Sequence, residues 1–226
     1  MPQRLTILIS GEIYHIFNRS IAQQPIFKTL RDHQRALGLV AFYLYQNPPL
    51  RYSHFNRLPQ DQKADFLETL AKSKKRLVEI LAFCIMPNHF HFLLKQLEDQ
   101  GIAKFMNNFQ HSYSKYYNVK NERTGSLFQA MFKGVRVESD EQLLHVSRYI
   151  HLNPVSSFLI NIKSLEHYPW SSLNYYIKNT NGLTFINAKP VLEHFKSKGG
   201  YKKFVFDQAD YQQKLDRIKH LTLEQL

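Results

Sequence analysis

The fold is decided by the stretch FCIMPNHFHFLLK, residues 83–95. It completes an apolar strand and turns at Pro87-Asn88 directly into a second strand. Successive side chains of a strand point to opposite faces, so His89 and His91 share one face while Phe90 lies on the other. The apolar face can be buried while two imidazoles stand side by side, close enough to share a metal ion. Two half-exposed histidines on a sheet would give the same pattern, so the choice depends on a third ligand and a nucleophile.

A helix is predicted to begin at Ser139, which suits the N-cap, with Gln142 at the capping-box position. Pro154 marks its predicted end. Tyr149 and Asn153 are one helical turn apart on the polar side of this helix, so a phenol and a carboxamide can face one site. Taken alone, Tyr149 could equally be a boundary residue of an amphipathic helix, as most of the 13 tyrosines must be.

The two patterns together resemble the HUH single-tyrosine transposases, which include the IS200-like family and the REP-associated tyrosine transposases. The resemblance rests on five ordered motifs, far more specific than one short pattern. They are YHIFNR (14–19), MPNHFHFLL (86–94), GSLFQAMF (125–132), YIHLNPV (149–155) and YPWSS (168–172). Two positions depart from the family pattern. Met131 stands where arginine is frequent, and Asn153 replaces the glutamine of the insertion-sequence branch, although asparagine is usual in the REP-associated branch.

The resemblance implies a DNA transposase and single-strand endonuclease with Tyr149 as the nucleophile. The phenolate would form a covalent 5′-phosphotyrosine, which a 3′-hydroxyl could reverse without a nucleotide cofactor. His89, His91 and the carbonyl oxygen of Asn153 would hold a divalent metal. Two neutral nitrogens and one oxygen suit Mg²⁺ or Mn²⁺, whereas zinc usually draws a thiolate or carboxylate. The expected substrate is single-stranded or hairpin DNA, and the resemblance allows one tyrosine acting alone or a homodimer that exchanges helices.

Three alternatives stay open at this stage. A metal-dependent hydrolytic nuclease could use the same histidines with water as the nucleophile. A noncatalytic DNA-hairpin-binding protein would need neither metal nor Tyr149. Among the tyrosines, Tyr113 and Tyr117 are also one turn apart and could supply the nucleophile, although the neighbouring Phe109 favours a packing role for them.

The chain of 226 residues has a net charge of +12 and a pI of about 9.7, which favours a polyanionic partner, DNA rather than a membrane surface. The predicted DNA-binding side chains are Arg19, Lys115, Arg148, Lys198, Lys202 and Lys203. The last three belong to an aromatic and lysine-rich stretch, 195–204, that could instead be a solvated turn. The single cysteine, Cys84, cannot form an internal disulfide, and the longest apolar run, 80–86, cannot span a bilayer. A cytoplasmic protein is expected.

The order of the predicted elements indicates an α+β fold. Strands are expected at 12–18, 77–86 and from 89 onward, helices at 31–45, 61–75, 101–117 and from 139 onward, and a strand or irregular extended segment at 127–137. An antiparallel sheet with helices packed on one face is a ferredoxin-like layout, which the family resemblance also implies. Residues 1–177 are predicted to form the transposase domain, and 178–226 a basic, aromatic helical extension with a turn at 180–182 and a charged helix at 208–226.

Overall fold

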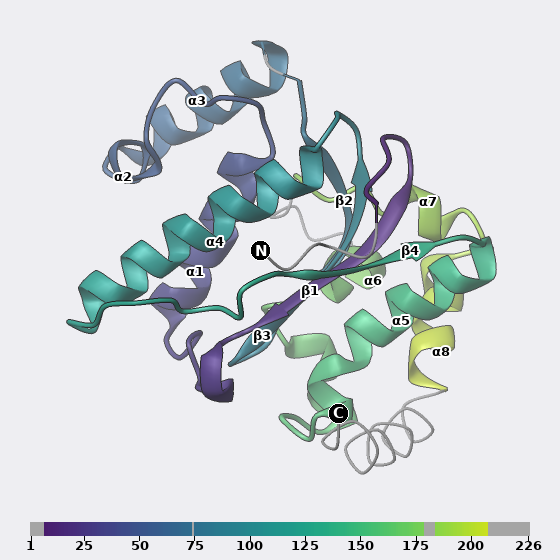
Figure 1. Cartoon of the computed structure of the whole chain (residues 1–226). Coiled ribbons are helices and arrows are strands. Elements are labelled where there is room, and N and C mark those ends of the chain that lie inside the picture. Colours follow the sequence, from purple (N-terminus) through teal and green to yellow (C-terminus); the bar gives the residue numbers. More distant parts are fainter. Residues whose placement is uncertain (1–6, 74, 179–183, 208–226) are drawn as a thin grey trace. The chain divides into compact units, whose positions relative to one another are not determined.

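The computed structural model describes residues 7–73, 75–178 and 184–207, which form both strands and helices (Figure 1). The elements up to the last strand are β1 (Ile13–Arg19), η1 (Ile21–Gln23), α1 (Leu30–Tyr43), α2 (Tyr52–Phe55), α3 (Gln60–Ser73), β2 (Val78–Ile85), β3 (His89–Gln96), α4 (Gly101–Lys120) and β4 (Lys133–Val137). The remaining elements are α5 (Asp140–Ser156), η2 (Ile162–His167), α6 (Leu173–Lys178), α7 (Lys189–Leu192) and α8 (Lys198–Phe206). The turn predicted at 180–182 and the helix predicted at 208–226 lie outside the described residues.

Four strands form one sheet in the order β2-β3-β1-β4. The backbone register shows that β1 and β3 run in opposite directions. The amide of Ser20 donates to the carbonyl of Asn88 (2.8 Å), and the amide of Gln96 donates to the carbonyl of Glu12 (3.0 Å), so the end of one strand lies against the start of the other. This strand order and the succession β-α-β-β-α-β give the ferredoxin-like α+β fold that the sequence predicts.

Most of the predicted elements appear close to their expected positions. The helices expected at 31–45, 61–75 and 101–117 are α1, α3 and α4, and the strands expected at 12–18 and 77–86 are β1 and β2. The extended segment predicted from residue 127 onward becomes a strand only at Lys133, after an isolated bridge between Phe128 and Ser20. No helix in the described ranges is long and apolar enough to cross a membrane.

The chain forms two compact units. The first, here called the α1/α4 unit, contains β1, α1 to α4, the ends of β2 and β3, and most of β4. Within it α1 and α4 pack against each other (Figure 1). The hydroxyl groups of Tyr43 on α1 and Ser112 on α4 are hydrogen-bonded at 2.7 Å. The start of α1 is fixed by a capping box, in which Thr29 and Asp32 each accept the other's backbone amide.

The second unit, here called the α5 unit, contains Ile80–Met86 with most of β2, Phe90–Leu93 of β3 and the elements from α5 onward. Its first helix begins as predicted, because Ser139 is the N-cap and its hydroxyl accepts from the amide of Gln142 (3.1 Å). The side-chain oxygen of Gln142 accepts from the amide of Glu138 (2.8 Å). A capping box would instead require the amide of Ser139, the N-cap residue.

The prediction that this helix ends at Pro154 is wrong, because α5 continues to Ser156. A proline inside a helix removes one backbone donor and with it one hydrogen bond to the residue four positions earlier. Here the carbonyl of Pro154 accepts from the amides of Leu159 and Ile160 (both 3.0 Å), so the chain that follows satisfies the end of the helix. The buried side chains of this last turn are a further reason for its persistence.

Candidate catalytic site

His89 is the first residue of β3 and is half-buried. Its Nδ1 lies 2.6 Å from Oδ1 of Asn88. Because an amide oxygen can only accept, the proton of the neutral ring lies on Nδ1, and the ring's lone pair lies on Nε2. Asn88 is itself fixed, since its Nδ2 donates to the carbonyl of Gln23 (3.0 Å). Asn88, which sequence reasoning placed only in a turn, therefore orients His89 as an outer-shell partner orients a metal-binding histidine.

His91 lies two residues further along β3 and is 5% exposed. Its neighbours Phe90 and Phe92 are fully buried, as the predicted alternation requires. The histidine is nevertheless more buried than a half-exposed sheet residue, because the ring of Tyr149 packs against it. The two ring centroids are 5.5 Å apart and the ring planes are at 88°, an edge-to-face contact. This contact joins the histidine strand to the tyrosine helix inside the α5 unit.

Tyr149 and Asn153 both belong to α5, where Tyr149 is half-buried and Asn153 is 4% exposed. The α5 unit thus contains His91 in contact with Tyr149, and Asn153 one helical turn beyond Tyr149. His89 shares strand β3 with His91. These are the four residues that the sequence singles out for the chemistry.

The metal ligands that the sequence predicts, His89, His91 and Asn153, would offer two imidazoles and one carboxamide. In the described part of the chain there is no group of three or more histidine, cysteine, aspartate or glutamate side chains that could hold a metal. A set of two neutral nitrogens and one amide oxygen fits Mg²⁺ or Mn²⁺ better than a metal that requires thiolates. The hydrogen bond from His89 Nδ1 to Asn88 agrees with such a role, because it leaves Nε2 as the unprotonated ring atom.

A buried polar network holds α5 in place. His151, two residues after Tyr149, is fully buried. Its Nδ1 lies 2.6 Å from the hydroxyl of Tyr201 on α8, and its Nε2 lies 2.7 Å from the hydroxyl of Ser172. Burial lowers the pKa of His151 to about 3, so the ring is neutral at pH 7. Ser172 also accepts from the amide of Phe83 on β2 (2.9 Å), so the network connects α5 to α8 and to the sheet.

The same network gives a structural role to two segments whose function the sequence left open. Ser172 closes the motif YPWSS (168–172), and the hydroxyl of Tyr168 in that motif donates to the carbonyl of Ile85 (2.7 Å). Tyr201 lies in the lysine- and aromatic-rich stretch, and its hydroxyl also donates to Oγ of Ser147 on α5 (3.2 Å). Sequence reasoning did not single out His151, Ser147 or Tyr201. The only sign of them in the sequence is that each is a polar residue on the apolar face of a helix.

The alternative tyrosines are core residues of the α1/α4 unit. Tyr113 is fully buried and donates to the carbonyl of Ile26 (2.8 Å), and burial raises the pKa of its phenol far above the usual value. Tyr117 is buried as well and donates to the carbonyl of Pro25 (3.4 Å). A nucleophilic phenol must reach a phosphate and lose its proton, and burial opposes both. The packing interpretation of this pair agrees with the structure.

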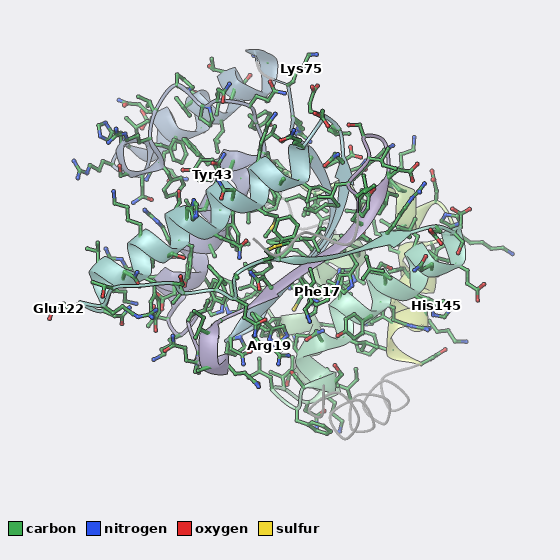
Figure 2. All side chains as sticks on the ribbon, in the orientation of Figure 1. Phe17, Arg19, Tyr43, Lys75, Glu122 and His145 are labelled. Atoms are coloured by element: carbon green, nitrogen blue, oxygen red, sulfur yellow. The ribbon has the colours of Figure 1, made fainter. Side chains whose placement is uncertain are left out.

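The predicted DNA-binding cations lie on several elements. Arg19 ends β1 and Arg148 is on α5, near His145 (Figure 2 labels Arg19 and His145). Arg148 lies 2.6 Å from Nδ1 of His145, and its guanidinium carbon is 4.2 Å from the ring centroid of Phe204. Lys202 is paired with Glu166 (2.5 Å), so its charge is partly neutralised. The others are half-buried or exposed: Lys115 on α4, and Lys198 and Lys203 on α8.

Comparison with known proteins finds one family model that matches the segment holding these residues. Residues 48–153 match the family model described as "Transposase IS200 like", a segment that contains His89, His91 and Tyr149 and ends at Asn153. This segment, a little under half of the chain, is similar to the IS200-like transposase family, as the sequence motifs indicate. Among solved structures, a REP-associated tyrosine transposase bound to a REP hairpin is similar, with 16% identity and a TM-score of 0.49. The similarity covers 78% of this chain and 86% of that chain. No curated protein matches the chain.

Proposed function

We propose that this protein is a DNA transposase that cleaves and rejoins single-stranded or hairpin DNA, with Tyr149 as the nucleophile. The observation that carries the proposal is the edge-to-face contact between His91 and Tyr149 (5.5 Å). It brings a phenol beside the histidine strand of an IS200-like transposase segment. Single-stranded DNA is the expected substrate, because an unpaired strand can bend into the site.

Tyr149 would exchange one phosphodiester bond for another. Its phenolate oxygen attacks phosphorus, a bond forms between that oxygen and phosphorus, and the bond from phosphorus to the 3′-oxygen breaks. The leaving 3′-oxygen takes up a proton from water, so the products are a 5′-phosphotyrosine and a strand that ends in a 3′-hydroxyl. Because the energy of the ester is retained, attack by a 3′-hydroxyl reverses the step and joins new ends without a nucleotide cofactor.

His89, His91 and Asn153 would hold the metal cofactor. When bound, Mg²⁺ or Mn²⁺ supplies polarisation of the scissile phosphate and neutralises its developing charge. Asn88 keeps the proton of His89 on Nδ1, which leaves Nε2 as the donor atom. The network around His151 fixes α5, so that Tyr149 and Asn153 keep their orientation relative to His91.

The cations would position the DNA. Arg19, Lys115, Arg148, Lys198 and Lys203 offer contacts to phosphates, and the ion pair with Glu166 makes Lys202 the weakest of the six candidates. The location of Tyr149 and His91 in the same compact unit supports a tyrosine that acts beside the histidine of its own chain. In a homodimer that exchanges helices, a mixture of Tyr149→Phe and His91→Ala subunits would instead recover cleavage.

The proposal is tested by trapping the covalent product. Wild-type protein, hairpin DNA with a single-stranded tail, and Mn²⁺ should give a protein–DNA adduct that survives denaturation, and Tyr149→Phe should give none. Tyr175→Phe, which removes the hydroxyl of another half-exposed tyrosine, is the matched control and should keep the adduct. Cleaved DNA without an adduct would indicate a hydrolytic nuclease, and binding without cleavage would indicate a noncatalytic DNA-binding protein. Either result would refute the proposal.

A further inference from the structure

The α1/α4 unit contains a basic hollow. None of the residues proposed for catalysis, His89, His91, Tyr149 and Asn153, lines it. It is a cavity of about 820 Å³ formed by α1, α2, α4 and the chain next to α2. Its cationic lining residues are Arg31, Arg35, Arg51, Arg57, Lys115 and Lys120, and none of the described aspartates or glutamates lines it. Lys120 is paired with Asp32 (2.6 Å), and the other five cations, with no carboxylate in the lining, give the hollow a positive potential that attracts polyanions. Of these residues the sequence singled out Lys115 alone.

Arg35 is the central residue of this hollow. Its guanidinium carbon lies 4.4 Å from the ring centroid of Tyr52 and 5.1 Å from that of Tyr116, so the side chain is held between two aromatic rings. The Nε atom of Arg35 is buried and has no hydrogen-bond partner. No carboxylate of the described residues lies within ion-pair distance of this guanidinium. A half-buried arginine without a counter-ion is costly, and an anionic ligand would supply the missing partner.

The rings that hold Arg35 are themselves fixed. The hydroxyl of Tyr116 donates to Asp32 (2.8 Å), which also accepts from Lys120 (2.6 Å). Burial acts to raise the pKa of Asp32, but the hydrogen bonds from Lys120, Tyr116 and Thr29 outweigh it and lower the pKa to about 2. The carboxylate of Asp32 therefore stays ionised, and its hydrogen bonds go to Lys120, Tyr116 and Thr29. It does not form an ion pair with Arg35.

Gly38 on α1 explains how Tyr52 reaches Arg35. A Cβ atom at residue 38 would collide with the hydroxyl of Tyr52, so only glycine leaves room for that ring. Glycine inside a helix lowers stability by about 1 kcal/mol relative to alanine. In α1 the missing side chain leaves the space in which the ring of Tyr52 stacks on Arg35. The position of Arg35 is therefore fixed by the packing around it, unlike that of a side chain exposed on the surface.

We propose that this hollow is a second DNA-binding site, in which Arg35, stacked between Tyr52 and Tyr116, binds a backbone phosphate outside the cleavage site. The proposal rests on the proposed function, since it requires that the chain binds DNA. An arginine fork matches two phosphate oxygens, and the surrounding cations offer contacts to neighbouring phosphates of the same strand. A phosphate contact of this kind carries no sequence information, so the site would position the DNA and leave its sequence to be read elsewhere.

The test compares two arginines that each lie over a tyrosine. Arg35→Met should weaken binding of a labelled hairpin DNA with a single-stranded tail by about 10-fold or more, measured by fluorescence anisotropy. The slope of log K against log salt should shrink by about 0.7 for each phosphate that the variant no longer neutralises. Arg76→Met is the matched control, because Arg76 lies 5.5 Å from the ring centroid of Tyr45 and loses the same charge. It should bind as the wild type does.

Two further measurements separate binding from folding. Arg35→Met removes a half-buried charge without a counter-ion, so its melting temperature should equal or exceed that of the wild type. Lys115→Ala, a change of an exposed residue, should weaken binding and reduce the salt slope without affecting the fold. Weak binding that accompanies a lower melting temperature of Arg35→Met, with Lys115→Ala unchanged, would assign Arg35 a structural role and overturn the proposal.

The outcomes also separate this site from the cleavage reaction. If the covalent adduct forms but Arg35→Met binds DNA as Arg76→Met does, the second site is refuted while the transposase function stands. If no adduct forms, but Arg35→Met loses affinity for DNA and Arg76→Met does not, the second site is supported and the proposed chemistry is refuted. A wild-type protein that binds no DNA would refute both.

Discussion

Acidification should destabilise this protein through one buried ring. His151 is fully buried, and burial lowers its pKa from 6.5 to about 3. Because the folded pKa lies below the unfolded one, the unfolded chain takes up the proton first as the pH falls. The stability is fully present above pH 6.5 and is lost progressively between pH 6.5 and 3. Each pH unit in that window costs up to about 1.4 kcal/mol, so the loss from this ring between pH 7 and pH 5 is about 2 kcal/mol.

Urea unfolding at pH 7 and at pH 5 measures this loss. The wild type should lose about 2 kcal/mol more unfolding free energy over this interval than His151→Leu, which has no group to titrate at that position. His167→Gln removes an exposed histidine and should follow the wild type. If the wild type and His151→Leu show the same pH dependence, the ring is not buried and neutral in the folded protein, and the reasoning is wrong.

Two further predictions follow from the hydrogen bonds of the site. Tyr201→Phe leaves His151 Nδ1 and Ser147 without a partner hydroxyl and should lower the unfolding free energy by about 1–3 kcal/mol, whereas Tyr175→Phe should change it by less than about 0.5 kcal/mol. Equal stability of the two variants would contradict the network. His89→Ala should abolish cleavage with the fold intact, and Asn88→Ala should weaken Mn²⁺ binding by about 10-fold in calorimetry. Unchanged Mn²⁺ affinity in both variants would exclude His89 as a ligand.

The sheet and its main helices could be predicted because their signals are local. Alternating apolar residues, the turn at Pro87-Asn88 and the N-cap Ser139 each act within a few residues, and the structure contains them where expected. The end of α5 could not be predicted from Pro154, because it depends on the amides of Leu159 and Ile160, which bond back to the helix. A local rule for proline cannot anticipate such partners.

The residues of the candidate site divide in the same way. His89, His91 and Tyr149 stand out by spacing and motif. The residues that hold them do not, since their partners are distant along the chain. Tyr201 meets His151 fifty residues away, and Asn88 meets Gln23 sixty-five residues away. Pairings of this length are set by the tertiary fold and leave no periodic trace in the sequence.

The placement of Ser147 and His151 has a mechanical consequence. They lie one helical turn apart, on either side of Tyr149 in the sequence of α5, and both are bonded to the hydroxyl of Tyr201. A DNA strand attached to Tyr149 would act as a tether, and any tension in it would pull on the middle of α5. The helix is held by fixed points before and after that residue, on its buried side. The buried contacts of the α5 unit would bear this tension. The 5′-phosphate attached to Tyr149 would then stay in place until a 3′-hydroxyl attacks it.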